Sequence, residues 1–169
     1  MTIPPRHREY WESFARARAV DPTPHFLEAF YFDDNESSAN ELAKLVFDGK
    51  KSATAALLWA YESERKRIPQ VGDISIVTNF SGLEVCVIET TQVDVVPFSD
   101  ITAAFAATEG EGDGSLEYWR HAHEAFFGRE CQRIGRVPEP RMPVVCERFE
   151  VVFTGQPPSD ASEETPLRQ

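Results

Sequence analysis

The strand-like segments of this sequence follow one another through turns, and this order restricts the fold more than any other feature. Stretches rich in β-branched and aromatic residues predict strands, or in the first case an extended arm, at 25–32, 74–80, 84–90 and 144–153. After a bend, residues 91–96 continue the extended pattern of the third strand. Helical spacing of apolar residues predicts helices at 5–18, 38–48 and 115–133. Because strands and helices do not alternate regularly, we expect an α+β fold with a mainly antiparallel sheet or barrel, rather than a doubly wound sheet.

The composition is typical of one globular domain. The chain has 169 residues, of which 41% are hydrophobic and 27% charged, so it can bury a core. No apolar run approaches the ~20 residues that span a bilayer. The first residues also lack the apolar stretch of a signal peptide. We therefore expect a cytoplasmic protein without a membrane partner.

The net charge of −11 limits how this chain could bind nucleic acid. Proteins that coat long nucleic acids make many phosphate contacts and are usually basic. Any RNA contact is therefore expected at a local site, on a short segment, a nucleotide or a nucleoside. The best local phosphate site is segment 50–67, with five basic and two acidic residues, although a solvated loop is the simpler explanation of that charge.

The cysteines and histidines do not suggest a metal site. Cys86, Cys131 and Cys146 are far apart and lie in apolar runs, so we expect buried thiols. No Cys or His pair has the spacing of zinc ligands. His121 and His123 lie two apart on a predicted helix, which places them on different faces. We expect the first at the surface and the second in the core, neither of them a ligand.

The region after the helix at 38–48 carries the candidate chemistry. Gly49 fits the position just past a helix end, and Lys50, Lys51, Ser52 and Thr54 follow it. In an extended strand Ser52 and Thr54 point to one side and Lys51 to the other. A turn after the glycine would instead let Lys51 and Thr54 converge. Without further information, two lysines at a helix end simply complement the helix dipole.

Two other stretches add candidates. Trp59 and Tyr61 offer aromatic faces on which a base could stack, although such residues more often lie in the core or at its rim. Further on, Ser99 or Asp100 is expected to cap a helix that runs to about residue 108. Glu109 would then open a flexible acidic loop at 109–114.

Segment 49–54, with the sequence Gly-Lys-Lys-Ser-Ala-Thr, resembles the G-x-K-x-x-T signature of the ASCH family. The segment 144–152 resembles that family's last strand, and 98–131 is similar to its longer bacterial subgroup. The resemblance covers residues 26–153. It implies a PUA-like antiparallel β-barrel with flanking helices and a cleft beside the glycine–lysine turn. The expected domains are a helical extension at 1–24, the ASCH domain at 25–154 and a disordered tail at 155–169.

The resemblance also implies activities. Some similar proteins remove the acetyl group of N(4)-acetylcytidine, and others look like ribonucleases that act on single-stranded RNA. The matching catalytic positions here are Lys51, Thr54 and Glu109, with Glu111 as the alternative to Glu109. Two positions depart from the family patterns: Ala56 stands where the amidohydrolases usually have arginine, and Gly128 where ribonuclease-like relatives have serine. The expected substrate-binding residues are Lys50, Ser52, Trp59, Tyr61 and Arg148.

These residues suggest a mechanism and its main alternative. Lys51 in an apolar cleft would have a lowered pKa and could take the proton of the Thr54 hydroxyl, while Glu109 protonates the leaving amine or positions the base. We therefore expect a hydrolase acting on RNA or a modified nucleoside, and alternatively a non-catalytic RNA-binding module. We expect no cofactor, with a divalent metal to be considered for a ribonuclease. The sequence leaves monomer and homodimer open. Whether the three catalytic candidates surround one cavity separates the two functions.

Overall fold

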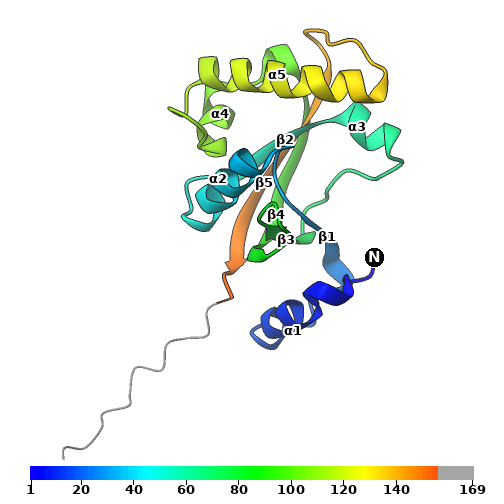
Figure 1. Ribbon diagram of the computed structural model, residues 1–169, viewed down its shortest axis with the longest axis vertical. Helices are drawn as coiled ribbons and strands as arrows, with labels where there is room; N and C mark the ends of the chain where they lie inside the picture. Colours follow the sequence, from blue (N-terminus) through cyan, green and yellow to red (C-terminus); the bar gives the residue numbers. More distant parts are fainter. Residues whose placement is uncertain (156–169) are drawn as a thin grey trace, which may run out of the picture.

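A computed structural model describes residues 1–155 (Figure 1). The strands within that range are β1 (Phe26–Phe30), β2 (Ala53–Leu57), β3 (Ile74–Thr78), β4 (Glu84–Pro97) and β5 (Pro143–Phe153). The α-helices are α1 (Arg8–Arg16), α2 (Glu36–Phe47), α3 (Leu58–Ser63), α4 (Ala103–Glu109) and α5 (Leu116–Ile134). Short 3-10 turns occur at Pro5–His7, Thr23–His25 and Phe98–Asp100. Apart from its first residue, the predicted disordered tail at 155–169 lies outside the described residues.

The strands form one sheet in the order β1-β3-β4-β5-β2. β1 pairs with β3 in parallel, and the other neighbours pair antiparallel. The pairing of β4 with β5 changes register near Val87 and again near Thr90, which are irregularities of the kind that bend a strand. β1 and β2 are the two edges and, in the described part of the chain, do not pair with each other. The expected α+β fold with a mainly antiparallel sheet is confirmed, with the sheet open rather than closed.

Helices cover the sheet at both ends (Figure 1). α3, α4 and α5 lie at one end, where Trp119 and Phe127 of α5 pack against alternate residues of β2 such as Ala55. α1 lies at the opposite end, and its Trp11 and Phe14 are buried against β1, β3 and β4. α2 covers a third region of the core. None of the described helices is long and apolar enough to cross a membrane.

The helix ends test the predicted caps. α2 ends as expected, because Gly49 follows it with a φ of +74°, a left-handed conformation that glycine adopts at no steric cost. α4 begins later than predicted: the Thr102 side chain caps it by accepting the backbone N–H of Phe105, while Ser99 and Asp100 lie in the preceding 3-10 turn. The cap prediction was wrong because Ser, Thr and Asp are all good caps, and burial of neighbouring residues decides among them.

The three cysteines, Cys86, Cys131 and Cys146, are free and buried, as expected. Burial raises the pKa of each thiol, to about 12 for Cys86 and Cys146. Buried thiols of raised pKa are unreactive, so their role is packing.

Candidate functional site

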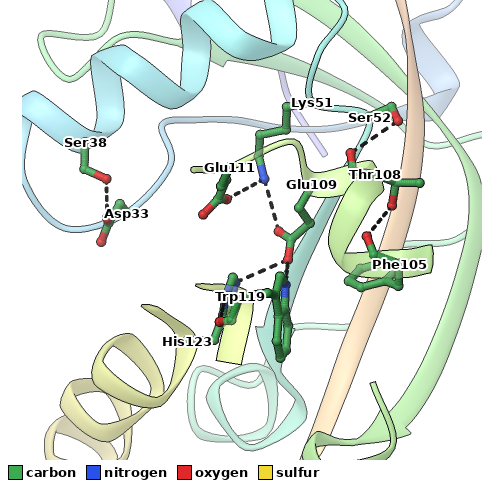
Figure 2. Close-up of polar contacts among 10 residues, drawn as sticks. All are labelled: Asp33, Ser38, Lys51, Ser52, Phe105, Thr108, Glu109, Glu111, Trp119 and His123. Carbon is green, nitrogen blue, oxygen red and sulfur yellow. Dashed lines mark hydrogen bonds and ion pairs between the residues drawn. The ribbon is translucent and has the colours of Figure 1, made fainter. Parts of the chain in front are cut away.

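Two segments that are far apart in the sequence cross at the site (Figure 2). Lys51 follows the turn at Gly49, and Glu109 is the last residue of α4. Gly110, with a φ of +64°, lies so close to the first segment that a Cβ built on it would be 2.0 Å from the carbonyl oxygen of Lys50. This contact requires glycine, and it brings the Lys51 and Glu109 side chains together.

A backbone hydrogen bond fixes the same crossing. The N–H of Ser52 donates to the carbonyl oxygen of Thr108 over 2.8 Å. On its other side, the carbonyl of Ser52 accepts the N–H of Phe149 over 3.0 Å. Ser52 therefore links the end of α4 to β5, and its exposed side chain lies outside the pocket.

The Lys51 ammonium is enclosed by two carboxylates (Figure 2). Its side chain is 1% exposed, and Nζ donates to Oε1 of Glu109 at 3.1 Å and to Oε1 of Glu111 at 2.9 Å. Nζ also lies 5.3 Å from the centre of the Phe32 ring, which is a favourable cation–π distance.

These neighbours set the charge of Lys51. Burial on its own would lower its pKa, but the attraction of Glu109 and Glu111 and their hydrogen bonds outweigh burial, so the pKa lies above its ordinary value. The expectation of a lowered pKa was therefore wrong, because the cleft is lined by carboxylates rather than apolar groups alone.

Glu109 is as deeply buried as the lysine that it binds. Its side chain is 1% exposed, and Oε2 accepts the indole N–H of Trp119 and lies 3.3 Å from Nε2 of His123. The His123 ring stacks on Trp119 with 4.0 Å between ring centres, and its Nδ1 lies 2.9 Å from the Trp119 carbonyl oxygen. The expectation that Glu109 opens a flexible loop was wrong, since α4 extends through it and α5 holds its carboxylate.

A pocket of about 100 Å³ opens beside these charges. Thr54 of β2 lines it, and the Thr54 hydroxyl has no hydrogen-bond partner within residues 1–155. The other lining residues come from the β1–α2 loop, α2, the α2–β2 turn, β2, the α4–α5 region and α5: Phe32, Asp33, Leu42, Lys51, Ala55, Glu109, Glu111, Ala122, His123, Phe126 and Arg129. The pocket thus gathers an ammonium, a hydroxyl and carboxylates.

The rim of the pocket holds an ion pair that the sequence did not reveal. Arg129 of α5 binds Asp34 of the β1–α2 loop, with 2.9 Å between Nε and Oδ2. The hydrogen bond from Arg129 is the largest of several effects that hold the pKa of Asp34 below its ordinary value. Asp33, which also lines the pocket, accepts a hydrogen bond from Ser38. No local motif links these positions, because they are about 95 residues apart.

The five predicted substrate-binding residues do not line this pocket. Lys50 is exposed, like Ser52. Trp59 packs against the core beneath the guanidinium of Arg136, 4.7 Å from its ring centre. Arg148 lies over the Phe105 ring at 5.4 Å and lines a separate cavity.

Tyr61 lines another cavity, together with Glu28 and Lys66. Two basic side chains of the segment 50–67 already have acidic partners here. Lys66 binds Glu64 at 2.8 Å, and Arg67 binds Asp73 at 2.7 Å.

His121 is exposed and His123 is buried, as predicted, but His123 also lines the pocket. One donor atom each from His123, Glu109 and Glu111 lies within 4.8 Å of the other two, close enough for a metal ion. The Lys51 ammonium donates to both glutamates, so a divalent cation could bind only if that ammonium moved away.

Comparison with known proteins identifies the fold family. A family model described as ASCH domain matches residues 28–153. The chain belongs to the ASCH domain family. The match lies within the predicted domain at 25–154, whose limits stay a prediction, as does the extension at 1–24.

Two solved structures are similar to this ASCH domain. One is an ASCH domain from Lactobacillus crispatus JV V101, with 35% identity and a TM-score of 0.84, covering 90% of this chain and 98% of that one. The other is a protein from Enterococcus faecalis V583, with 25% identity and a TM-score of 0.78, covering 96% of this chain and 97% of that one. A search of curated proteins gave no significant match. The ASCH domain is a PUA-like RNA-binding fold, which confirms the expected family and architecture.

Proposed function

We propose that this ASCH domain is a hydrolase that removes an acyl group from an amide nitrogen of a modified nucleoside derived from RNA. One observation carries the proposal: a buried ammonium and an unpartnered hydroxyl, those of Lys51 and Thr54, line one pocket together with Glu109 and Glu111. An amide carbonyl needs both a nucleophile and a positive group near its oxygen.

In the proposed reaction, Oγ1 of Thr54 attacks the carbonyl carbon of the amide and loses its proton to a base. The Lys51 ammonium stabilises the negative charge that develops on the carbonyl oxygen. The C–N bond then breaks, and the departing nitrogen takes up a proton. Water hydrolyses the acyl–threonine ester, which releases a carboxylic acid and restores the hydroxyl.

The protonation of Lys51 decides its role in this scheme. Because its pKa lies above the ordinary value, Lys51 carries its charge at neutral pH and is suited to electrostatic stabilisation rather than to proton abstraction. Glu109 and Glu111 hold the ammonium at the pocket and act as positioning residues. The base that receives the Thr54 proton must therefore be another group.

The charge around the pocket favours a nucleoside over an RNA chain. The pocket has a volume of only about 100 Å³, and Asp33 and Glu111 line it. With a net charge of −11, the protein would repel a polyanion, whereas a neutral nucleoside avoids this cost. A ribonuclease would need the phosphate to approach Lys51 past its two carboxylate partners. A non-catalytic binding module is the alternative that the RNA-binding fold itself favours.

The direct test is to incubate the protein with N(4)-acetylcytidine and, separately, with unstructured single-stranded RNA. We expect deacetylation by the wild type and a loss of about 10²–10³-fold or more in Thr54→Ala and Lys51→Met, since each removes a group that acts on the transition state. Ser52→Ala is the matched control, because Ser52 is exposed and outside the pocket.

Each alternative has its own result. Unchanged turnover in both pocket variants would remove this site from the reaction. Binding of cytidine without cleavage would establish the binding module, and cleavage of RNA alone would establish a ribonuclease. A chelator is expected to leave deacetylation unchanged, because the Lys51 ammonium occupies the place between the glutamates that a metal ion would need.

A further inference from the structure

Glu147 is another buried carboxyl, and it lies beside Thr54. It belongs to β5, where it is directly opposite Thr54 of the antiparallel neighbour β2. Residues that face each other in an antiparallel pair project their side chains to the same side of the sheet, with Cβ atoms about 4.5–5.5 Å apart. The Glu147 carboxyl and the Thr54 hydroxyl therefore share one face.

In the part of the chain that the structure describes, Glu147 has a hydrogen-bond donor but no cation as its partner. Its side chain is 8% exposed, and Oε1 accepts a hydrogen bond from Oγ1 of Thr90 at 2.6 Å. Within residues 1–155, no ion pair involves Glu147. Burial raises the pKa of Glu147 to about 7, and the Thr90 hydrogen bond opposes this rise.

The titratable groups that face Glu147 disfavour its ionised form. Glu28 of β1 and Asp73, just before β3, repel its charge and, after burial, contribute to the rise of its pKa to about 7. Tyr61 of α3 is a third neighbour, since burial and then the charge of Glu147 raise the pKa of its hydroxyl. The basic side chains nearby bind other acids: Arg67 binds Asp73, and Lys66 binds Glu64.

A buried carboxyl without a cation is costly, and such groups concentrate where a protein performs chemistry. The proposed reaction lacks a base, because Lys51 is already protonated. A general base works best when its pKa lies near the working pH. Glu147 meets this requirement, and it faces the one hydroxyl that must lose a proton.

We infer that Glu147 is the general base of this site and accepts the Thr54 hydroxyl proton. The inference rests on the proposed function. As the Oγ1–carbon bond forms, the proton passes to the Glu147 carboxylate, and as the C–N bond breaks, it passes to the departing nitrogen. In the second half, Glu147 takes a proton from the attacking water. It returns that proton to Oγ1 of Thr54 when the ester bond breaks, so every proton is accounted for.

The experiment is a pH profile of kcat/KM for N(4)-acetylcytidine between pH 5 and 9. For the wild type we expect a rise to a plateau around pH 7, where Glu147 ionises. Glu147→Gln should lower the plateau by about 10²–10⁴-fold and abolish the rising limb, because it removes the proton acceptor. Glu150→Gln is the matched control: Glu150 is exposed on the same strand, an odd number of positions away and so on the opposite face.

The variant Thr90→Val tests whether Glu147 titrates during catalysis, because a purely structural role of Glu147 would leave the midpoint of the pH profile unchanged. The Thr90 hydrogen bond favours the ionised carboxyl, so its loss should raise the pKa of Glu147 and shift the midpoint of the profile to higher pH. This variant keeps the base in place, so it also decides the question if Glu147→Gln fails to fold, as judged by circular dichroism. An unshifted midpoint in Thr90→Val would then overturn the inference.

The outcomes for the two proposals can be told apart. If Thr54→Ala is inactive while Glu147→Gln keeps the wild-type rate and pH profile, the inference fails and the proposed function stands. If the wild type does not turn over the nucleoside, the proposed function fails and Glu147 loses its role with it.

Discussion

Glu109 and Glu147, two of the buried carboxyls of this domain, lie in opposite electrostatic environments. The Glu109 carboxylate accepts hydrogen bonds from the Lys51 ammonium and the Trp119 indole N–H, and it lies next to the His123 imidazole. The Glu147 carboxyl accepts one hydrogen bond from a hydroxyl and has acidic neighbours. The Glu109 carboxylate is thus held in an ion pair, whereas the Glu147 carboxyl can gain or lose a proton near neutral pH. Burial alone does not determine what a carboxyl can do, because its donors and neighbouring charges decide.

The largest effect is expected from breaking the compensated environment. Lys51→Met leaves Glu109 buried without its cation, and breaking a buried ion pair in this way costs about 3–5 kcal/mol of unfolding free energy. Urea denaturation measures this, with Lys50→Met as the exposed control. The double variant Lys51→Met/Glu109→Gln should recover part of the loss. A single variant as stable as the wild type would show that the pair does not hold the two segments together.

The second effect concerns the uncompensated carboxyl. The folded-state pKa of Glu147 is about 7, above the ordinary value of 4.5, so the unfolded chain ionises first as the pH rises. The free energy of unfolding is therefore unaffected by Glu147 ionisation below about pH 4.5. It falls by about 3 kcal/mol as the pH rises from there to about 7. Glu147→Gln should be more stable than the wild type at pH 8 but not at pH 4. Denaturation curves at both pH values test this, and an equal difference at the two would contradict it.

A smaller effect should follow from weakening one donor to Glu109. Trp119→Phe keeps an aromatic ring but removes the indole N–H that the carboxylate accepts. Hydrogen bonds to charged groups contribute about 1.5–3 kcal/mol, so we expect a loss of about 2 kcal/mol at neutral pH by chemical denaturation. Phe98, which packs near the same indole ring, offers a comparison, since Phe98→Leu changes packing without touching the carboxylate.

The smallest effect is expected at the rim. Arg129→Gln removes an ion pair with Asp34 in which both side chains are about half exposed. Such pairs contribute about 0.2–1 kcal/mol, and salt weakens them further. Thermal denaturation at low and high salt should therefore give nearly the same result for this variant and the wild type. A large loss of stability would mean that the rim, and not only the buried pair, holds the pocket closed.

The sequence predicted the local features of the site better than the distant ones. Gly49 and its left-handed turn follow from one helix end, and the Lys51–Thr54 spacing could be read directly from the chain. The surroundings of Lys51 could not, because the glutamates that set its pKa lie 58 and 60 residues away. Burial of Glu109 was missed because an acidic, glycine-rich run normally indicates a solvated loop.

The alternation of side chains along β5 marks Glu147 in the sequence as an inward-facing acidic residue. Along the strand, Glu147 alternates with Phe149 and Val151, which belong to the core cluster beneath α2. An acidic residue in an inward-facing set is the informative exception in a strand. The neighbours that raise its pKa come from other elements, so the sequence could point to the position but not to its chemistry.

The close contact between Gly110 and the carbonyl of Lys50 is possible only because glycine has no Cβ atom. A single methyl group at position 110 would push the two segments apart and separate the ammonium from its carboxylate without altering any charged residue. Anyone transplanting this pocket onto another scaffold would have to move both segments and the glycine as one piece.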